Sequence, residues 1–238
     1  MACKRLDLTV GRNIGVVFAM LPFFVGERVE FALNYGPVSG GTGVMEVRDI
    51  KNIDGADCFH LFSAAKTNWF FSLFFKIDDT WESYCTTDSM YTIRYEKRLR
   101  EKLCNMDVSV DFDHKREMVF YSDGDSIEMT KGAMDFLTSI YYIRTLELSV
   151  GDTIFVNNHT DKENYPLEIY VLKKERVNTF AGIFDCLKCE LLSKGGGIFG
   201  SKGGLTIWVT DDSKKLPVLI DSKVAIGSIR AIARKIKR

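Results

Sequence analysis

The sequence has no excess of charge of either sign. Its 238 residues include 32 Lys and Arg and 32 Asp and Glu, so the formal net charge at pH 7 is zero. A protein without net charge sets up no long-range field that would draw in a phosphate backbone or an anionic lipid surface. General nucleic-acid binding is therefore disfavoured. Since 46% of the residues are hydrophobic and 27% are charged, the chain has the balance of a globular protein with a real core.

Long hydrophobic runs are also absent. No stretch of about 18 apolar residues occurs, so we expect no helix that spans a membrane. The only candidate targeting segment comes first, where Lys4 and Arg5 precede an apolar stretch from Ile14 to Leu21. This stretch is short for a signal peptide and has no clean small-x-small cleavage site before Pro22. We therefore expect residues 1–21 to be an N-terminal extension or an atypical signal segment, and residues 22–238 to be a single β-rich domain.

Motifs for catalysis or metal binding are missing as well. The three histidines, His60, His114 and His159, are isolated from one another, and no serine lies in a G-x-S-x-G elbow. The six cysteines are scattered along the chain. Cys186 and Cys189 form a C-x-x-C pair, but they fall in a predicted strand, where residues three apart face opposite sides. We expect no catalytic residue, no metal site and no cofactor.

The glycine cluster at residues 195–200 matches G-x-G-x-x-G in its letters only. A dinucleotide site needs a strand before the glycines and a helix after them, so that the helix N-terminus faces the pyrophosphate. Here the chain runs on into Leu205–Val209, which reads as a strand. We interpret the cluster as a flexible hairpin loop.

Alternation of apolar and polar residues dominates the chain. Val29, Phe31 and Leu33 share one face of a predicted strand, while Glu30 and Asn34 point the other way. Similar runs occur at 44–50, 58–63, 80–86, 91–97, 107–113, 118–121, 153–157, 167–172, 184–191, 205–210 and 218–232, and turn residues occur at Gly40–Gly41, Asp54–Gly55, Asp123–Gly124 and Asp211–Asp212. About a dozen strands are more than a flat open sheet holds without curling. The sequence therefore predicts a mainly β fold with a large curled antiparallel sheet, a half-barrel or barrel-like meander.

One main helix is expected from Ala133 to Arg144, where apolar residues form a broad face that packs on the sheet. It lies between two similar segments. Val25-Gly26-Glu27 and Val150-Gly151-Asp152 each lead into an alternating run, as a turn that starts a strand would. We expect two related halves of the sheet with the helix at their junction.

An aromatic run follows Asn68 and does not alternate as a strand does. Trp69, Phe70, Phe71, Phe74 and Phe75 lie within seven residues and suit a short helical turn packed on the sheet. As part of the core, the run would plug the mouth of a curled sheet. As a functional element, it would line a cavity for an acyl chain, where buried area supplies affinity at about 25 cal/mol per Å². The candidate ligand-binding residues are these five aromatics together with Phe136, Ile140 and Tyr141 of the helix.

The densest carboxylate group is formed by Asp78, Asp79 and Glu82. If these side chains met His60 in a cleft, they would suit general acid–base chemistry and a hydrolase of envelope sugars or lipids. Acidic residues at the start of a strand are more often solvated, so this is the third of our functional hypotheses.

Seven segments together resemble the bacterial domain-of-unknown-function family numbered 3108. They keep their order over roughly residues 22 to 232 and are 22–27, 65–68, 94–97, 141–144, 181–186, 205–212 and 224–228. The resemblance implies proteins that usually look exported, to the periplasm or outer membrane, without an established activity. It also implies a sheet similar in outline to the half-barrels of periplasmic lipoprotein and lipid carriers. The poor export signal and Cys189 depart from the usual pattern.

These observations favour a non-enzymatic protein of the cell envelope. Our first hypothesis is that it holds a lipid or a lipoprotein acyl chain within the curled sheet. The alternative is a structural or protein-interaction module of the envelope, in which the same aromatics form a filled core and an exposed sheet edge recruits an envelope protein. We expect a periplasmic or outer-membrane-associated location, and the atypical export signal leaves a cytoplasmic one open.

Overall fold

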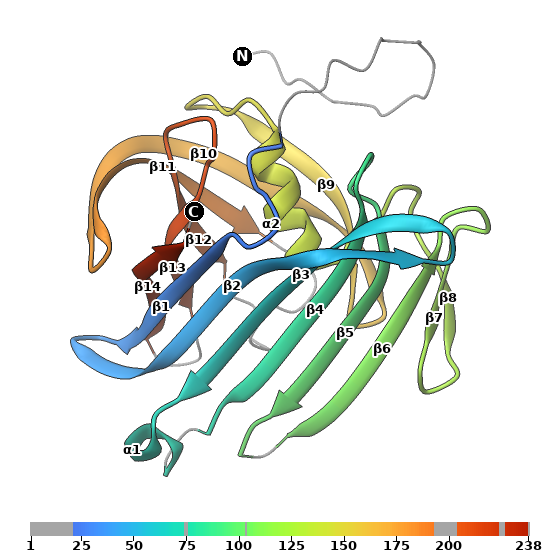
Figure 1. Ribbon diagram of the computed structural model, residues 1–238, viewed down its shortest axis with the longest axis horizontal. Coiled ribbons are helices and arrows are strands. Elements are labelled where there is room, and N and C mark those ends of the chain that lie inside the picture. Colours follow the sequence, from blue (N-terminus) through green and yellow to red (C-terminus); the bar gives the residue numbers. More distant parts are fainter. Residues whose placement is uncertain (1–20, 74–75, 103, 193–203, 224–226, 238) are drawn as a thin grey trace.

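The computed structural model describes residues 21–73, 76–102, 104–192, 204–223 and 227–237. These ranges hold fourteen strands and two helices, shown in Figure 1. The elements are β1 (Arg28–Tyr35), β2 (Val38–Ile53), β3 (Ala56–Thr67), α1 (Trp69–Ser72), β4 (Asp78–Thr86), β5 (Thr92–Arg100), β6 (Asn105–Asp113), β7 (Met118–Tyr121), β8 (Ser126–Glu128), α2 (Phe136–Thr145), β9 (Thr153–Thr160), β10 (Glu163–Thr179), β11 (Gly182–Leu192), β12 (Leu205–Thr210), β13 (Pro217–Lys223) and β14 (Ser228–Lys237).

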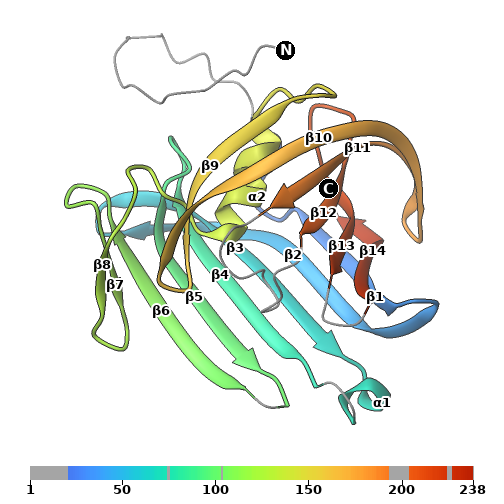
Figure 2. The ribbon, with the colours of Figure 1, turned by 180° about the vertical axis from the view of Figure 1, so that it is seen from behind.

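All the strands belong to one antiparallel sheet. Its order is β8-β7-β6-β5-β4-β3-β2-β1-β14-β13-β12-β11-β10-β9, so β1 and β14 join the two halves and β8 and β9 are the edges. The sheet curls around α2 without closing, as Figures 1 and 2 show from opposite sides. This confirms the predicted mainly β fold with a large curled antiparallel sheet.

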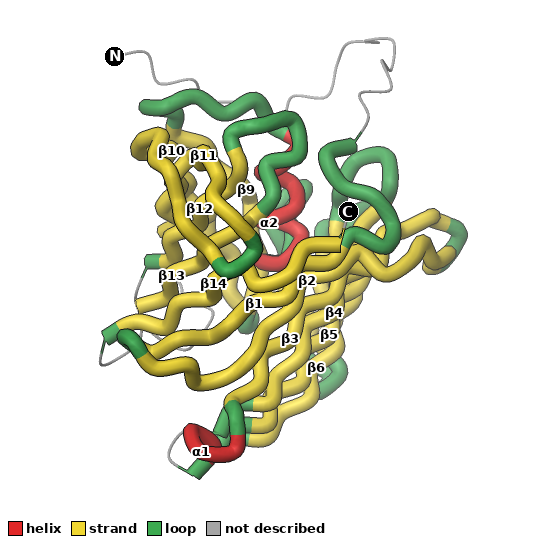
Figure 3. Tube along the Cα trace, turned by 60° about the vertical axis from the view of Figure 1, so that its left-hand side comes forward, coloured by secondary structure: helices red, strands yellow, loops and turns green. Residues whose placement is uncertain are grey.

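Apart from the edge strands β8 and β9, the sheet has two further edges, which are formed by the ends of its strands. These two edges carry different connections. Because neighbouring strands run in opposite directions, the connections that follow odd-numbered strands, including α1 after β3, lie at one edge. The connections that follow even-numbered strands, including α2 after β8, lie at the other. We call these the α1 edge and the α2 edge. Figure 3 shows α1 and α2 at opposite ends of the sheet.

The core lies on the inside of the curl. On β1, Val29 and Phe31 are buried and face inward, whereas Arg28 and Glu30, which alternate with them, are half-buried on the outer face. The inward residues of most strands meet the apolar face of α2 in one hydrophobic cluster. None of the helices in the described part of the chain is long and apolar enough to cross a bilayer.

Each predicted strand overlaps an observed one, but three details were wrong. The run at 218–232 is two strands, β13 and β14, and the three-residue β8 was not predicted. Gly40–Gly41 is not a turn but part of β2, and the β1–β2 turn instead contains Gly36. The reason for glycine at position 41 is close strand packing, since a Cβ there would lie 2.2 Å from the Lys66 carbonyl oxygen.

The predicted echo between the two halves is present in the backbone. Gly26 and Gly151 have φ angles of 93° and 95°, in the region that favours glycine. The Gly26 N–H donates to the Val47 carbonyl at 2.7 Å, and the Gly151 N–H donates to that of Val171 at 2.8 Å. The same turn thus starts β1 and β9, and α2 lies at the junction of the halves.

Candidate functional site

The inside of the curl contains a hollow with a free volume of about 150 Å³. Every region of the sheet except β6 to β8 contributes to its wall, and the side chains are mostly apolar. The lining residues are Phe31, Leu33, Gly43, Val44, Met45, Ser63, Ala64, Ala65, Ile77, Trp81, Tyr95, Lys97, Phe136, Leu137, Ile140, Thr160, Asp161, Tyr165, Leu167, Leu191, Leu205, Ile220, Ser222, Ile229 and Ala231. We call this space the cavity.

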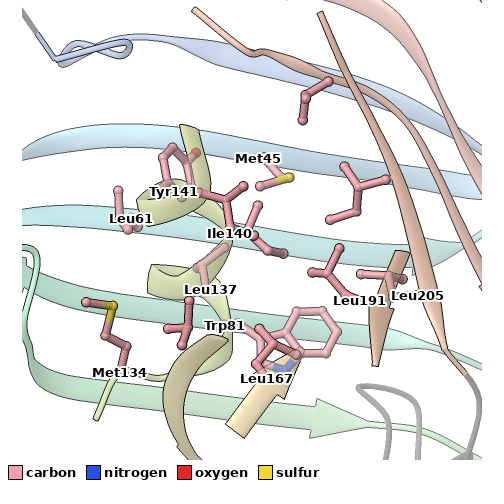
Figure 4. Packing of buried hydrophobic residues seen from close by; sticks show 14 of the residues in the cluster. Met45, Leu61, Trp81, Met134, Leu137, Ile140, Tyr141, Leu167, Leu191 and Leu205 are labelled. Carbon is pink, nitrogen blue, oxygen red and sulfur yellow. The ribbon is translucent and has the colours of Figure 1, made fainter. Parts of the chain in front are cut away.

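Helix α2 forms the inner end of the cavity. Leu137 and Ile140, one turn apart, face the space between the two halves of the sheet, as Figure 4 shows. Met45 lies on one wall and Leu191 and Leu205 on the other. The spacing of apolar residues that predicted an amphipathic helix therefore also places an apolar floor beneath the cavity.

The cavity is less covered toward the α1 edge. Leu33 at the end of β1, Ile77 just before β4 and Ile229 at the start of β14 all lie at that edge and are half-buried. The lining residues near α2, such as Leu137 and Leu167, are buried. The cavity is therefore more accessible from the α1 edge than from the side of α2.

One charged pair lies in the wall. Lys97 sits on the inward face of β5 between Tyr95 and Leu99, and its side chain is only 9% exposed. Its ammonium donates to Asp161 Oδ1 at 3.1 Å. Asp161 belongs to the β9–β10 turn, so this contact joins the two halves across the gap between β8 and β9.

Further contacts cross the same gap. The Tyr121 hydroxyl and His159 Nε2 form a buried hydrogen bond of 2.7 Å, and Lys162 pairs with Asp123 at 2.6 Å. Burial lowers the pKa of the His159 imidazole, which keeps the ring neutral. The gap between the edge strands is thus bridged by side chains, while backbone pairing stops there.

The aromatic run does form a short helix, but it is not packed inside the curl. It caps the β3–β4 hairpin at the α1 edge, where Trp69 is 79% exposed and Phe70 is 50% exposed. Phe71 is half-buried against Gly40, and Phe74 and Phe75 lie outside the described residues. The prediction that the run plugs the curled sheet is therefore wrong for its described residues. None of them lines the cavity.

The three candidate residues of α2 divide between two places. Phe136 and Ile140 line the cavity, as expected for ligand-binding residues. Tyr141 lies on another side of the helix, 1% exposed, with its ring 5.2 Å from that of Phe23 in an edge-to-face arrangement. That a ligand contacts any of them stays a prediction.

The three carboxylates do not converge. Asp78 pairs with Lys66 at 2.8 Å, and Glu82 lies on the outer face, where its carboxylate is 2.5 Å from His60 Nε2. Asp79 faces inward and is buried. Strand alternation separates residues 79 and 82, so the three carboxylates do not gather in a cleft with His60, although Glu82 contacts it.

The C-x-x-C residues lie in β11, as predicted, and are both free and buried. Burial raises the pKa of the Cys186 thiol to about 12 and that of Cys189 to about 11, so both stay protonated. Within the described ranges no group of His, Cys, Asp and Glu is arranged to hold a metal. The glycine cluster at 195–200 and the segment 1–20 lie outside the described residues.

Sequence reasoning missed the strand residues of the cavity. Leu191, Leu205 and Ala231 come from the second half of the sheet, and no local pattern indicates that they face Phe31 and Met45. Lys97 did carry a usable signal. It occupies the apolar phase of an alternating strand, where a charged side chain points toward the core.

The arrangement of the chain is similar to that of solved proteins. A β-barrel-like protein of domain of unknown function DUF1849 from Brucella abortus matches with a TM-score of 0.62 and 10% identity, covering 90% of this chain and 98% of that one. A candidate exported protein with a YmcC-like fold from Bacteroides fragilis matches with a TM-score of 0.41 and 13% identity, covering 92% and 98%. A candidate lipoprotein from Parabacteroides distasonis matches with a TM-score of 0.39 and 10% identity, covering 90% and 96%.

The similarity to the Brucella protein shows a shared fold and nothing about activity. A search of curated proteins found no match to the chain. The family model that matches carries the description "Protein of unknown function (DUF3108)" and covers residues 30–234, most of the sequence. The chain therefore belongs to the DUF3108 family.

Proposed function

We propose that the protein is a non-enzymatic binding protein of the cell envelope that holds an amphiphile by its acyl chain. The observation that carries this proposal is the cavity between the halves of the sheet, whose wall is apolar apart from a few groups such as Lys97 and Asp161. Such a space suits a ligand that is recognised by its apolar area. The resemblance of the sequence to DUF3108 proteins implies export, and this implication supports an envelope location.

The size of the cavity narrows the ligand class. Pockets for drug-sized ligands typically measure about 300–1,000 Å³, whereas this cavity has about 150 Å³. A bulky or multi-chain lipid would not fit inside. We therefore propose a single acyl chain, with its tip against Ile140 and its polar head toward the α1 edge.

Lys97 gives the proposed ligand a polar contact. Its ammonium makes a 3.1 Å hydrogen bond to Asp161 from within an apolar wall. An anionic head group near the cavity mouth would compete with Asp161 for that ammonium, because a charge-assisted hydrogen bond is strong where water is scarce. The preferred ligand is therefore an acyl chain with an anionic head, such as a fatty acid.

Displacement of a fluorescent fatty acid by saturated fatty acids of increasing length tests the proposal. Each methylene buried in the cavity contributes about 0.8 kcal/mol, so affinity should rise roughly fourfold per carbon and level off when the cavity is full. Native mass spectrometry after gentle purification should show retained lipid. A protein that binds no fatty acid, or binds all lengths equally, would disprove it.

A matched pair of variants locates the binding. Ala231 lines the cavity, and Ile232 is the next residue of β14, with its side chain on the other face. Ala231→Phe should fill the cavity and lower fatty-acid affinity at least tenfold, whereas Ile232→Phe should leave it nearly unchanged. Equal losses in both variants would place the binding elsewhere.

The alternative, an interaction module with a filled core, is less well supported. A filled interior and one long unpaired strand would favour it, whereas the interior contains the cavity. At the edges, β8 has only three residues, and β9 receives hydrogen bonds from the segment before α2, where the Met134 N–H donates to the Asn157 carbonyl at 2.9 Å.

A further inference from the structure

Large apolar side chains are exposed together at the α1 edge. On and beside α1, Trp69 is 79% exposed, Leu73 60% and Phe70 50%. The neighbouring β1–β2 turn adds Tyr35 and Val38, which are 41% and 50% exposed. We call these five residues the aromatic tip. Exposed apolar residues gathered in this way commonly mark a surface that meets a partner or a membrane.

The aromatic tip is held in place by hydrogen bonds. The Asn68 side chain caps α1 by accepting from the Phe71 N–H at 2.9 Å, and its amide donates to the Ser39 carbonyl at 3.0 Å. The Asn68 N–H donates to Gly40 at 2.8 Å, which joins the helix to the start of β2. The exposure of Trp69 is therefore built into the hairpin.

Two lysines flank α1 along the chain, and a third contacts it. Lys66, Lys76 and Lys102 are all exposed, and the Lys102 ammonium donates to the Leu73 carbonyl at 3.0 Å. Lys66 also forms an ion pair with Asp78. Tryptophan amid apolar residues and flanked by lysines is the composition that binds the interface of a bilayer, where rings enter the head-group region and ammonium groups reach lipid phosphates.

From this combination we infer that the aromatic tip is a docking surface for a lipid bilayer that contains anionic lipids. The charge that matters is local, because the whole chain has zero net charge and exerts no long-range attraction. Docking would also orient the molecule. Ile77 and Ala65, which line the cavity, lie close to α1 in the chain, so the cavity mouth would face the lipid surface.

The test uses the full chain and sedimentation with lipid vesicles. The wild-type protein should bind vesicles of phosphatidylcholine mixed with phosphatidylglycerol, and bind pure phosphatidylcholine more weakly. The triple variant Trp69→Ser, Phe70→Ser, Leu73→Ser should bind these vesicles roughly tenfold more weakly or worse, because its three replaced side chains no longer enter the bilayer interface. Replacing Lys66, Lys76 and Lys102 by Gln should abolish the preference for phosphatidylglycerol.

A matched control lies at the opposite edge of the sheet. Phe180 and Ile183, at the β10–β11 turn, are each 64% exposed. The variant Phe180→Ser, Ile183→Ser should bind vesicles as the wild type does. Circular dichroism of all variants should be unchanged, because the replaced residues are exposed.

Three results would overturn the inference: no vesicle binding by the wild type, an equal loss in the Phe180 and Ile183 variant, or a dimer that the aromatic-tip variant abolishes. The last would assign the surface to a second copy of the chain. Fatty-acid binding measured without vesicles should be unchanged in the aromatic-tip variant, so docking and cavity binding can fail independently.

Discussion

At the scale of single residues, Asp79 combines a charged group with a buried position. It is 1% exposed on the inward face of β4, beside the cavity residue Trp81. One carboxyl oxygen accepts from the Arg100 N–H at 2.9 Å, and the other has no hydrogen-bond partner within the described structure. Burial raises the pKa of this carboxyl, although Lys97 nearby acts against it. Ionised Asp79 therefore costs the folded state free energy.

The pH dependence of stability should reveal this cost. Because the folded-state pKa of Asp79 is raised, its contribution to stability is fully present below the unfolded pKa of about 4 and is lost as pH rises through the folded value. Asp79→Asn keeps the acceptor for Arg100 and removes the titration. Between about pH 4 and pH 7, the free energy of urea unfolding of the wild type should fall relative to the variant.

Asp107→Asn provides a control of opposite sign. Hydrogen bonding to Arg100 lowers the pKa of the exposed Asp107 carboxyl, so its contribution is lost as pH falls. Its variant should therefore show a weak trend in the other direction. Parallel pH profiles for the wild type and Asp79→Asn would contradict the account of Asp79.

At the scale of elements, α2 is fixed by its N-cap. Asp135 is fully buried and accepts from the N–H groups of Leu137 and Thr138 at 2.8 and 3.1 Å. The hydroxyls of Ser83 on β4 and Thr92 on β5 also donate to it, each at 2.7 Å. One carboxylate thus starts the helix and attaches it to two strands, which sets the inner end of the cavity.

Loss of this cap should be costly. Asp135→Ala removes the acceptor for the first turn and leaves three buried hydroxyls, those of Ser83, Thr92 and Thr138, without it. We therefore expect destabilisation of about 3 kcal/mol or more by guanidinium unfolding. At the N-cap of α1, Asn68→Ala should cost only about 1 kcal/mol, because that helix is short and exposed. Similar costs at the two caps would show that Asp135 does not anchor α2.

The elements themselves were largely predictable, because alternation and helical spacing are local properties. Most strands and α2 follow from them, as does the turn before β1 and β9. The position of α1 was not predictable in this way. Five aromatics indicate a preference for burial, but whether Trp69 is buried depends on where the β3–β4 hairpin ends relative to the other strands. Gly41 likewise looked like a turn residue and instead permits close strand packing.

At the scale of the whole molecule, the fold depends on contacts between distant segments, and no local sequence pattern predicts these contacts. Lys97 and Asp161 are 64 residues apart, yet they join the halves beside the cavity. The number of strands predicted a curl, but the pairing of β1 with β14 decides which walls face each other. The cavity residues of β11 to β14 were therefore missed, whereas Phe136 and Ile140 of the predicted helix do line the cavity.

Another contact between distant segments lies at the α2 edge. The guanidinium of Arg144 donates to both carboxylate oxygens of Glu27, at 2.7 and 2.9 Å, and to the carbonyls of Pro22 and Lys214 at 3.1 Å. Both charged side chains are at most 3% exposed. The pair therefore ties the segment before β1 and the β12–β13 connection to α2.

Breaking this pair on one side should be severe, because a buried charge then remains without its partner. For Arg144→Met we expect a loss of about 3–5 kcal/mol in the free energy of unfolding, measured by guanidinium titration. The double variant Glu27→Gln, Arg144→Met should recover part of that loss, since no charge is left uncompensated. Arg176→Met breaks a pair whose members, Arg176 and Asp185, are 72% and 70% exposed, and should cost less than about 1 kcal/mol. If the double variant were no more stable than Arg144→Met, the loss of stability would come from lost packing around Phe23 and not from the unpaired Glu27 carboxylate.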